Sequence, residues 1–267
     1  MPTAQINGIT LNYQIDGPDS AAETIVLING LADDLESWGF QIPALVDAGF
    51  RVLRFDNRGI GKSDAPAGAY SSRMLANDAK ALVDLLGIKG FHLMGVSMGG
   101  MISEEYAIAY PGDLKSLTLA CTYGKADAFC QIMFAMWADL ARATSVPFVM
   151  RDVALWAFTG PFFEERPDDA AAFAAAMAAL PMSLEAYISQ LAVIQAHDAT
   201  DRLGQIKLPT LVLAGEEDIL IPVRLSKKLK EAIPGAAWAT VPGGHACLWE
   251  SPEPFNTTFI NYIHSQS

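Results

Sequence analysis

Long hydrophobic runs are absent from this 267-residue chain, and none approaches the roughly 18 to 20 residues that span a bilayer. The N-terminus also lacks a basic segment followed by an apolar core, the pattern of a secretory signal. We therefore expect a cytoplasmic protein without a membrane partner.

Cysteine is scarce as well. The three cysteines, Cys121, Cys130 and Cys247, are odd in number and show no close paired spacing. A disulfide framework and a zinc site both need such pairs. We therefore expect reduced thiols and no metal, in keeping with a cytosolic location.

Basic residues are outnumbered, because 18 Lys and Arg stand against 30 Asp and Glu, for a net charge of -12. The one local group, Lys227, Lys228 and Lys230, has the spacing of a solvated helix face. A nucleic-acid partner requires a basic patch, so none is expected. With 51% hydrophobic and 18% charged residues, the composition is that of a folded globular protein.

Apolar, β-branched runs alternate with helix-forming stretches along most of the chain. After a hairpin turn expected at Asn7-Gly8, strands are predicted at Thr24–Ile28, Phe50–Phe55, Phe91–Met94, Leu114–Ala120, Thr210–Ala214 and Ala237–Val241. Helices are predicted at Trp38–Asp47, Ser72–Leu86, Arg224–Ile233 and Glu253–His264, and another follows Gly100. This alternation predicts a mostly parallel sheet with helices on both faces.

The alternation breaks between residues 122 and 206. This stretch is rich in Ala, Met and aromatic residues and has helical patterns at Asp169–Leu180 and Leu184–Ala196. We predict one core domain formed by residues 1–121 and 207–267, with 122–206 as a helical insertion.

The segment Gly95-Val96-Ser97-Met98-Gly99 matches the G-x-S-x-G nucleophile elbow. The motif is short, but an apolar strand precedes it and a helix-forming stretch follows, as the elbow requires. A serine hydroxyl attacks only when a base takes its proton. Ser97 is therefore the candidate nucleophile.

Four histidines could supply that base. His92 lies within a predicted strand, His197 at the end of a helix in the insertion, and His264 near the C-terminus. His245 instead lies in a Gly-rich loop after the last strand, at the sheet edge where open α/β sheets bind ligands. We predict that His245 is the base.

An acid that orients the base should leave another strand at the same edge. The strand Thr210–Ala214 runs into Gly215-Glu216-Glu217-Asp218. Asp218 is favoured, and Glu216 or Glu217 is the alternative. The order Ser97, Asp218, His245 is that of α/β-hydrolase triads.

An oxyanion formed by attack at Ser97 needs fixed donors. One donor is expected from the backbone N–H of Met98, directly after the nucleophile. The other is expected from the backbone N–H of Leu31, unless Asn29-Gly30 is merely a turn.

The chain resembles the α/β-hydrolase superfamily over nearly its whole length, and within it the capped esterase, enol-lactonase and cofactor-free perhydrolase group. The resemblance rests on Ile28 to Leu31 with Ser37-Trp38, Phe55 to Gly59 with Gly61-Lys62-Ser63, Gly95 to Gly100, Pro209 to Asp218, and Gly244-His245 with Glu250-Ser251-Pro252. It implies an eight-stranded sheet, and it gives Asp56 and Arg58 structural roles. Asn29 departs from the His-Gly that is frequent there.

The resemblance also implies that residues 122–206 form a cap over Ser97. Candidate pocket residues in the cap are Met133, Phe134, Trp137, Trp156 and Met182, which together indicate a largely apolar pocket. Arg142 and Arg151 are candidates to bind a substrate carboxylate. Cys247 either lines the pocket or is an inert buried thiol.

The sequence thus predicts a serine hydrolase of small, largely apolar carboxylic esters or lactones that needs no cofactor. Enol-lactone opening, C–C bond hydrolysis or perhydrolysis by the same triad is the alternative chemistry. A small-ligand receptor on a hydrolase fold is the non-enzymatic alternative. A homodimer is compatible with the sequence.

Overall fold

Eight strands form a single sheet in the computed structural model, which describes residues 2–266. The spatial order is β1-β2-β4-β3-β5-β6-β7-β8, and only the β1–β2 and β2–β4 pairs are antiparallel. The strands are β1 (Thr3–Ile6), β2 (Ile9–Asp16), β3 (Thr24–Ile28), β4 (Arg51–Phe55), β5 (Phe91–Val96), β6 (Leu114–Ala120), β7 (Thr210–Gly215) and β8 (Ala237–Val241). The predicted mostly parallel, eight-stranded α/β-hydrolase sheet is confirmed.

The central strands end level with one another. Ile28 at the end of β3 pairs with Gly95 on β5, and Val96 pairs with Ala120 at the end of β6. Ala120 in turn pairs with Leu213 on β7. The loops that follow these strands therefore meet at one edge, where residues far apart in sequence can form a site.

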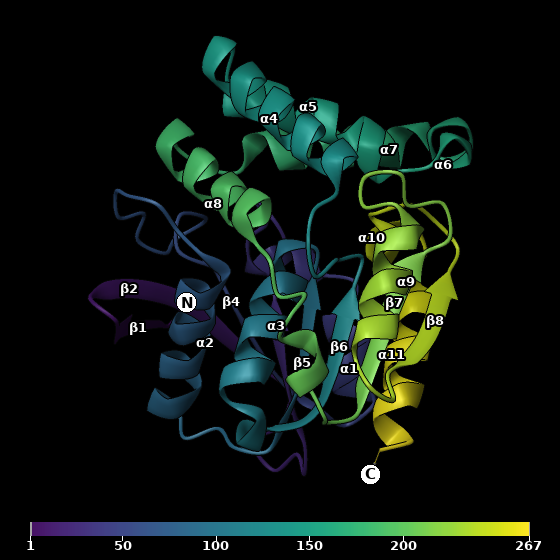
Figure 1. Cartoon of the computed structure of the whole chain (residues 1–267). Coiled ribbons are helices and arrows are strands. Elements are labelled where there is room, and N and C mark those ends of the chain that lie inside the picture. The colour runs from purple at the N-terminus through teal and green to yellow at the C-terminus, as the bar shows by residue number, and fades with distance from the viewer. Residues whose placement is uncertain (1, 267) are drawn as a thin grey trace.

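Helices cover both faces of the sheet, as expected (Figure 1). On one face α1 (Ile42–Asp47) and α11 (Pro252–His264) contribute Leu45, Phe255 and Phe259 to a core cluster with the strands. The other face is covered by three helices, α2 (Ser72–Leu85), α3 (Met98–Ala109) and α9 (Val223–Ala232). Short turns lie at Leu35–Trp38, Pro111–Asp113 and Leu203–Gln205, with α10 at Cys247–Glu250.

The prediction of a single helix at Trp38–Asp47 is wrong. The chain forms a 3-10 turn at Leu35–Trp38, and α1 begins only at Ile42. Two residues explain the interruption: Gly39 has a low helix propensity, and Pro43 is tolerated only in the first turn of a helix.

Five helices between β6 and β7 lie over the edge of the sheet at which the central strands end (Figure 1). They are α4 (Ala128–Ala143), α5 (Val146–Ala157), α6 (Gly160–Glu165), α7 (Pro167–Ala179) and α8 (Leu184–Ala196). Four begin at a residue whose side-chain oxygen accepts a backbone N–H of the first turn, namely Asp127, Ser145, Thr159 and Ser183. We refer to α4–α8 as the cap helices.

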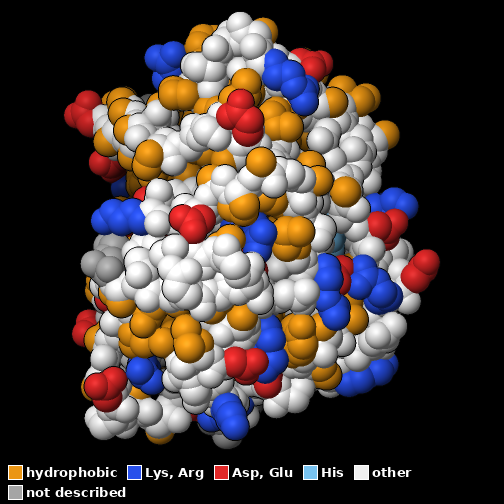
Figure 2. Space-filling view, turned by 90° about the vertical axis from the view of Figure 1, so that its left-hand side faces the viewer, with side chains coloured by type: hydrophobic (Ala, Val, Ile, Leu, Met, Phe, Trp, Pro, Cys, Tyr) orange, Lys and Arg blue, Asp and Glu red, His pale blue; other side chains and the backbone are white. Residues whose placement is uncertain are grey.

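On the face shown in Figure 2, basic and acidic side chains lie side by side, with hydrophobic side chains between them. Within residues 2–266, no single helix combines the length and apolarity needed to cross a membrane. The bent pair formed by α7 and α8 reaches that length and composition only when both helices are taken together.

Candidate active site

Ser97 lies in a sharp turn between β5 and α3. Its backbone angles, φ 56° and ψ −121°, are ones that residues with a side chain rarely adopt. The flanking glycines are sterically required: a Cβ on Gly95 would overlap the carbonyl oxygen of Gly99, and a Cβ on Gly99 would overlap that of Ile28. The turn therefore packs tightly against β3, and it presents the Ser97 side chain above the sheet edge.

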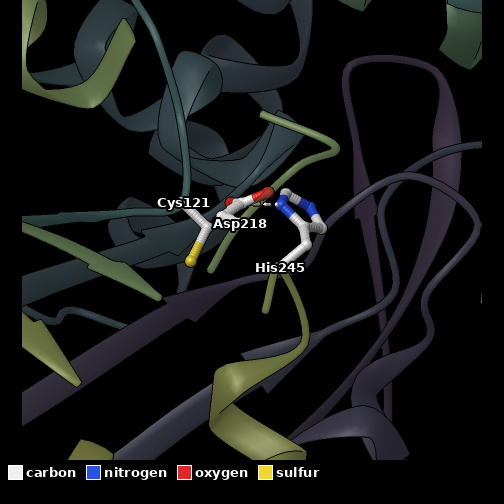
Figure 3. A group of neighbouring side chains, drawn as sticks. All are labelled: Cys121, Asp218 and His245. Atoms are coloured by element: carbon white, nitrogen blue, oxygen red, sulfur yellow. Dashed lines mark hydrogen bonds and ion pairs between the residues drawn. The ribbon is translucent and has the colours of Figure 1, made fainter. Parts of the chain in front are cut away.

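His245 and Asp218 come from the two loops beside this turn. Nδ1 of His245 lies 2.9 Å from Oδ2 of Asp218 (Figure 3). The other Asp218 oxygen accepts the backbone N–H of Ile221 at 2.8 Å, which fixes the carboxylate. Glu216 and Glu217 are exposed, whereas Asp218 is buried. The structure thus brings Asp218, and neither glutamate, to His245.

Gly215 explains how the two loops come so close. A Cβ at this position would overlap the carbonyl oxygen of Gly244, so any other residue would push the His245 loop away from the end of β7. Ser97 and His245 line the same pocket. Because Nδ1 of His245 is bound to Asp218, Nε2 is left as the nitrogen for proton transfer.

The electrostatics of the pair follow from its burial. Burial of the imidazole opposes its protonation, but the charge and hydrogen bond of Asp218 outweigh this and raise the pKa of His245 above its usual value. Asp33 acts in the same direction through its charge. A positive charge that develops on His245 is therefore stabilised where it forms.

Cys121 lies within reach of Asp218 and His245, so the three offer a set of donors to a metal ion (Figure 3). The thiol faces Cys247, with 3.5 Å between the sulfur atoms. The hydrogen bond to Cys247, together with burial, raises the pKa of the Cys121 thiol well above its usual value. Metals bind the thiolate, so this set fits a metal poorly.

The three cysteines are free and buried. Cys247 begins α10, and the pocket wall beside it is formed by His245, Ala246 and Leu248. Of the two interpretations of Cys247, the structure supports the buried thiol.

Leu31 and Met98 carry the two backbone N–H groups that are predicted to bind an oxyanion. Leu31 lines the same pocket as Ser97, and Met98 is the first residue of α3, where backbone N–H groups have no partner within the helix. Among the hydrogen bonds of residues 2–266, neither N–H has an acceptor in the protein. Both donors are thus available to a bound oxygen atom.

The loop that carries Leu31 is held from two sides. Within the body, the Asn29 side chain accepts the indole N–H of Trp38 and donates to the carbonyl of Asp33 at 3.1 Å. From the cap, Gln190 on α8 accepts the N–H of Ala32 at 3.0 Å. Asn29 thus holds the loop that carries Leu31 in place.

Asp56 also has a structural role. Its two oxygens accept the backbone N–H groups of Leu35 and Lys62, each at 2.8 Å, and the side chain of Asn12 at 2.7 Å. Arg58 makes a two-pronged ion pair with Asp78, at 2.6 and 2.7 Å. Both residues hold the loop after β4 in place.

The other histidines have structural partners. His92 on β5 binds the hydroxyl of Ser116 at 2.7 Å, and His264 stacks on Phe50. His197 bridges Ser72 and Glu104, at 2.9 Å to each, and so links the end of α8 to α2 and α3.

Only part of the predicted pocket is brought to Ser97. Phe134 and Trp137 on α4 line the pocket around Ser97. Met133 and Trp156 line a separate groove on the outside of α4 and α5, and Met182 packs half-buried against the core. Arg142 and Arg151 are exposed on the cap helices.

Sequence reasoning missed most of the pocket wall. On α5, Met150, Val153 and Ala157 face Ser97, and their spacing of three and four residues marks one helix face. That periodicity could have indicated them. Trp249 on α10 and Asp33 in the loop after β3 also line the pocket, and no periodic signal marks either.

The fold and this site together define an α/β hydrolase. The sequence profile of the α/β hydrolase fold matches residues 23–252, and the chain belongs to this family. The candidate carbamate hydrolase RutD of Azorhizobium caulinodans is 30% identical over 263 residues, which is 98% of each chain.

Solved structures agree with this assignment. The enol-lactonase from Burkholderia xenovorans LB400 superimposes with a TM-score of 0.92 at 30% identity, covering 98% of this chain and 100% of the enzyme. A hydrolase from Pseudomonas aeruginosa PA01 superimposes with a TM-score of 0.89 at 26% identity, covering 98% of this chain and 97% of that hydrolase. The chain is thus a hydrolase of the α/β fold.

Proposed function

We propose that this protein hydrolyses small, largely apolar carboxylic esters or lactones through an acyl-serine intermediate on Ser97. The observation that carries the proposal is the hydrogen bond between His245 Nδ1 and Asp218 Oδ2, beside a serine on a strained elbow. The similarity to the enol-lactonase from Burkholderia xenovorans supports the same class of substrate.

In the proposed reaction, Ser97 Oγ attacks the carbonyl carbon while His245 Nε2 takes the hydroxyl proton. The carbonyl oxygen becomes an oxyanion and accepts the N–H groups of Leu31 and Met98. His245 then gives its proton to the leaving alcohol, and the acyl group stays on Ser97. A water molecule, deprotonated by His245, releases the acid and restores the serine.

The pocket supports small substrates. Its free volume is about 50 Å³, and apolar side chains make up most of its wall. Short acyl groups can bury there with a favourable hydrophobic contribution of about 0.8 kcal/mol per methylene group. We therefore propose a preference for short acyl chains.

A second candidate is carbamate hydrolysis, which the similarity to RutD of Azorhizobium caulinodans favours. A carbamate presents the same kind of carbonyl to Ser97 but would leave a carbamoyl group on the serine. Mass spectrometry of the intact protein distinguishes the two adducts.

Steady-state hydrolysis of p-nitrophenyl esters, from acetate to longer chains, tests the main proposal, with Ser97→Ala as the matched control. We expect turnover that is fastest for short chains and is lost in the variant. Equal rates in both proteins would contradict the proposal. Failure on esters, lactones and carbamates alike, combined with tight binding of a small apolar ligand, would instead favour the receptor alternative.

A further inference from the structure

Asp33 lies where two cavities meet. The pocket around Ser97 shares three wall residues with a second, larger groove, namely Asp33, Met177 and Trp249. The groove has a free volume of about 230 Å³, against about 50 Å³ for the pocket. A substrate that fills the pocket and extends into the groove therefore passes the Asp33 side chain.

The Asp33 carboxyl group is close to Ser97. Oδ2 of Asp33 lies 2.9 Å from the point that a Cβ on Gly30 would occupy, and Cβ of Ser97 lies 3.5 Å from that same point. The separation of the two atoms therefore cannot exceed the sum of these distances. Asp33 thus faces the reacting centre from the loop that also carries Leu31.

No local structural need accounts for this carboxyl group. The neighbouring Asp34 starts the 3-10 turn by accepting the N–H of Glu36 at 2.9 Å. Asp33 contributes only its backbone carbonyl to the hydrogen bonds of the loop, where it accepts the side chain of Asn29. Within residues 2–266 its side-chain oxygens accept no hydrogen bond. The half-buried Asp33 carboxyl group is thus without a donor from the protein and can accept one from a ligand.

The charges around the two cavities have one sign. Asp34 and Glu36 join Asp33 in the groove, and no Lys or Arg belongs to either wall among the described residues. His245 is the one titratable group in the pocket that can be positive. Burial first, and then the charge of Asp34, raises the pKa of Asp33 to about 7, against the opposing effect of His245.

We propose that Asp33 determines specificity: its carboxyl group binds an N–H or O–H donor of the substrate beside the scissile carbonyl and excludes substrates that carry a carboxylate there. The inference rests on the proposed ester hydrolysis and narrows it to uncharged or cationic substrates with such a donor. Asp33 acts by contact with substrate, and the transfer of protons stays with His245.

Three esters of one acid, at the chain length that the p-nitrophenyl series selects, test this inference. The propyl and 2-hydroxyethyl esters are nearly isosteric and differ by an O–H donor, while the carboxymethyl ester carries a carboxylate. We expect the wild type, above pH 7, to hydrolyse the hydroxyethyl ester about tenfold faster than the propyl ester in kcat/KM, since one hydrogen bond to a charged group is worth at least that factor. The carboxymethyl ester should be about a hundredfold slower than the propyl ester, because the like charges repel.

Two variants separate charge from hydrogen bonding. Asp33→Asn keeps the shape and removes the charge, so its discrimination against the carboxymethyl ester should fall about tenfold or more. Asp33→Leu removes the acceptor and should equalise the propyl and hydroxyethyl esters. Asp47→Asn, an equal charge change at an exposed position on α1, should leave both ratios unchanged.

The outcomes are distinct. Unchanged ratios in Asp33→Asn, with hydrolysis that still depends on Ser97, would overturn the inference and leave the proposed function standing. If Asp33→Leu does not fold, the ester ratios of Asp33→Asn alone test the inference. Absence of Ser97-dependent hydrolysis for all three esters, and for the p-nitrophenyl series, would overturn the proposed function itself.

Discussion

Gln190 accepts the backbone N–H of Ala32 across 3.0 Å, and this hydrogen bond links the cap to the loop that carries Leu31. The same side chain donates to the carbonyl of Arg58 at 2.9 Å, so it joins three segments. Ala32 has a φ of 56°, an angle that needs outside support in a residue other than glycine. Gln190 is therefore a positioning residue for the proposed oxyanion site.

We expect Gln190→Leu to lower kcat by about tenfold, because the N–H of Leu31 is then held less firmly, and the loss of such a donor altogether costs 10²–10³. KM should change less. Ser189→Ala, which removes a bond from the same helix to the carbonyl of Gly68, is the control. Equal kinetics in the two variants would show that the loop needs no support from the cap.

Asp218→Asn should reduce turnover by a factor on the order of 10⁴, because the amide favours the wrong tautomer of His245. Glu217→Gln removes a neighbouring exposed charge and should have little effect. Steady-state kinetics on the best ester measures both. Near wild-type turnover in Asp218→Asn would assign the acid to another residue.

The pH dependence of kcat/KM should show an acidic limb above pH 6.5, because Asp218 and Asp33 raise the pKa of His245, and only the neutral imidazole accepts the serine proton. Asp33→Asn removes one of these negative charges, so its limb should move to lower pH. Profiles for an uncharged ester measure this. A limb that does not move would mean that Asp33 is electrostatically isolated from His245.

Asp33→Asn should also stabilise the protein at pH 8. The raised pKa, about 7 when folded against roughly 3.9 when unfolded, means that the folded state holds a proton more tightly. Stability of the wild type therefore falls as pH rises from about 4 to 7. The variant should gain roughly 1 to 4 kcal/mol at pH 8 and nothing near pH 4, which urea unfolding at both pH values measures.

Trp137 lines both the pocket around Ser97 and the groove outside α4 and α5, so it forms a wall between them. Trp137→Leu should open that wall and shift the preference toward longer acyl chains. Trp156→Leu changes the groove alone and serves as the control. Thermal melting shows whether either variant is folded, and an unchanged chain-length profile in a folded Trp137→Leu would argue against the wall.

The strands and the candidate triad were predictable because local pattern determines them. β5 and β7 are buried along their whole length, so each is predominantly apolar in sequence, with only His92 and Thr210 polar. The loop after each strand then carries the reactive residue, and parallel strands deliver Ser97 and Asp218 to the same edge. His245 was predictable because, of the four histidines, it alone lies in a Gly-rich loop after the last strand of the sheet.

The pocket was less predictable because it depends on how helices pack. Phe134 faces Ser97, whereas Met133, one residue earlier on α4, faces the outer groove. Composition cannot separate such neighbours, because successive helical residues point about 100° apart. Asp33 gave no signal either, since an acidic loop residue is ordinarily solvated.

The strained backbone of Ser97 sets stability against activity in the evolution of such a protein. A residue held at φ 56° and ψ −121° costs on the order of 1 to 3 kcal/mol, and glycine at that position would relieve the cost while erasing the nucleophile. Under selection for thermal stability alone, glycine would therefore be favoured at position 97, and the protein would keep its fold but lose its activity. Only continued demand for turnover keeps the serine in place.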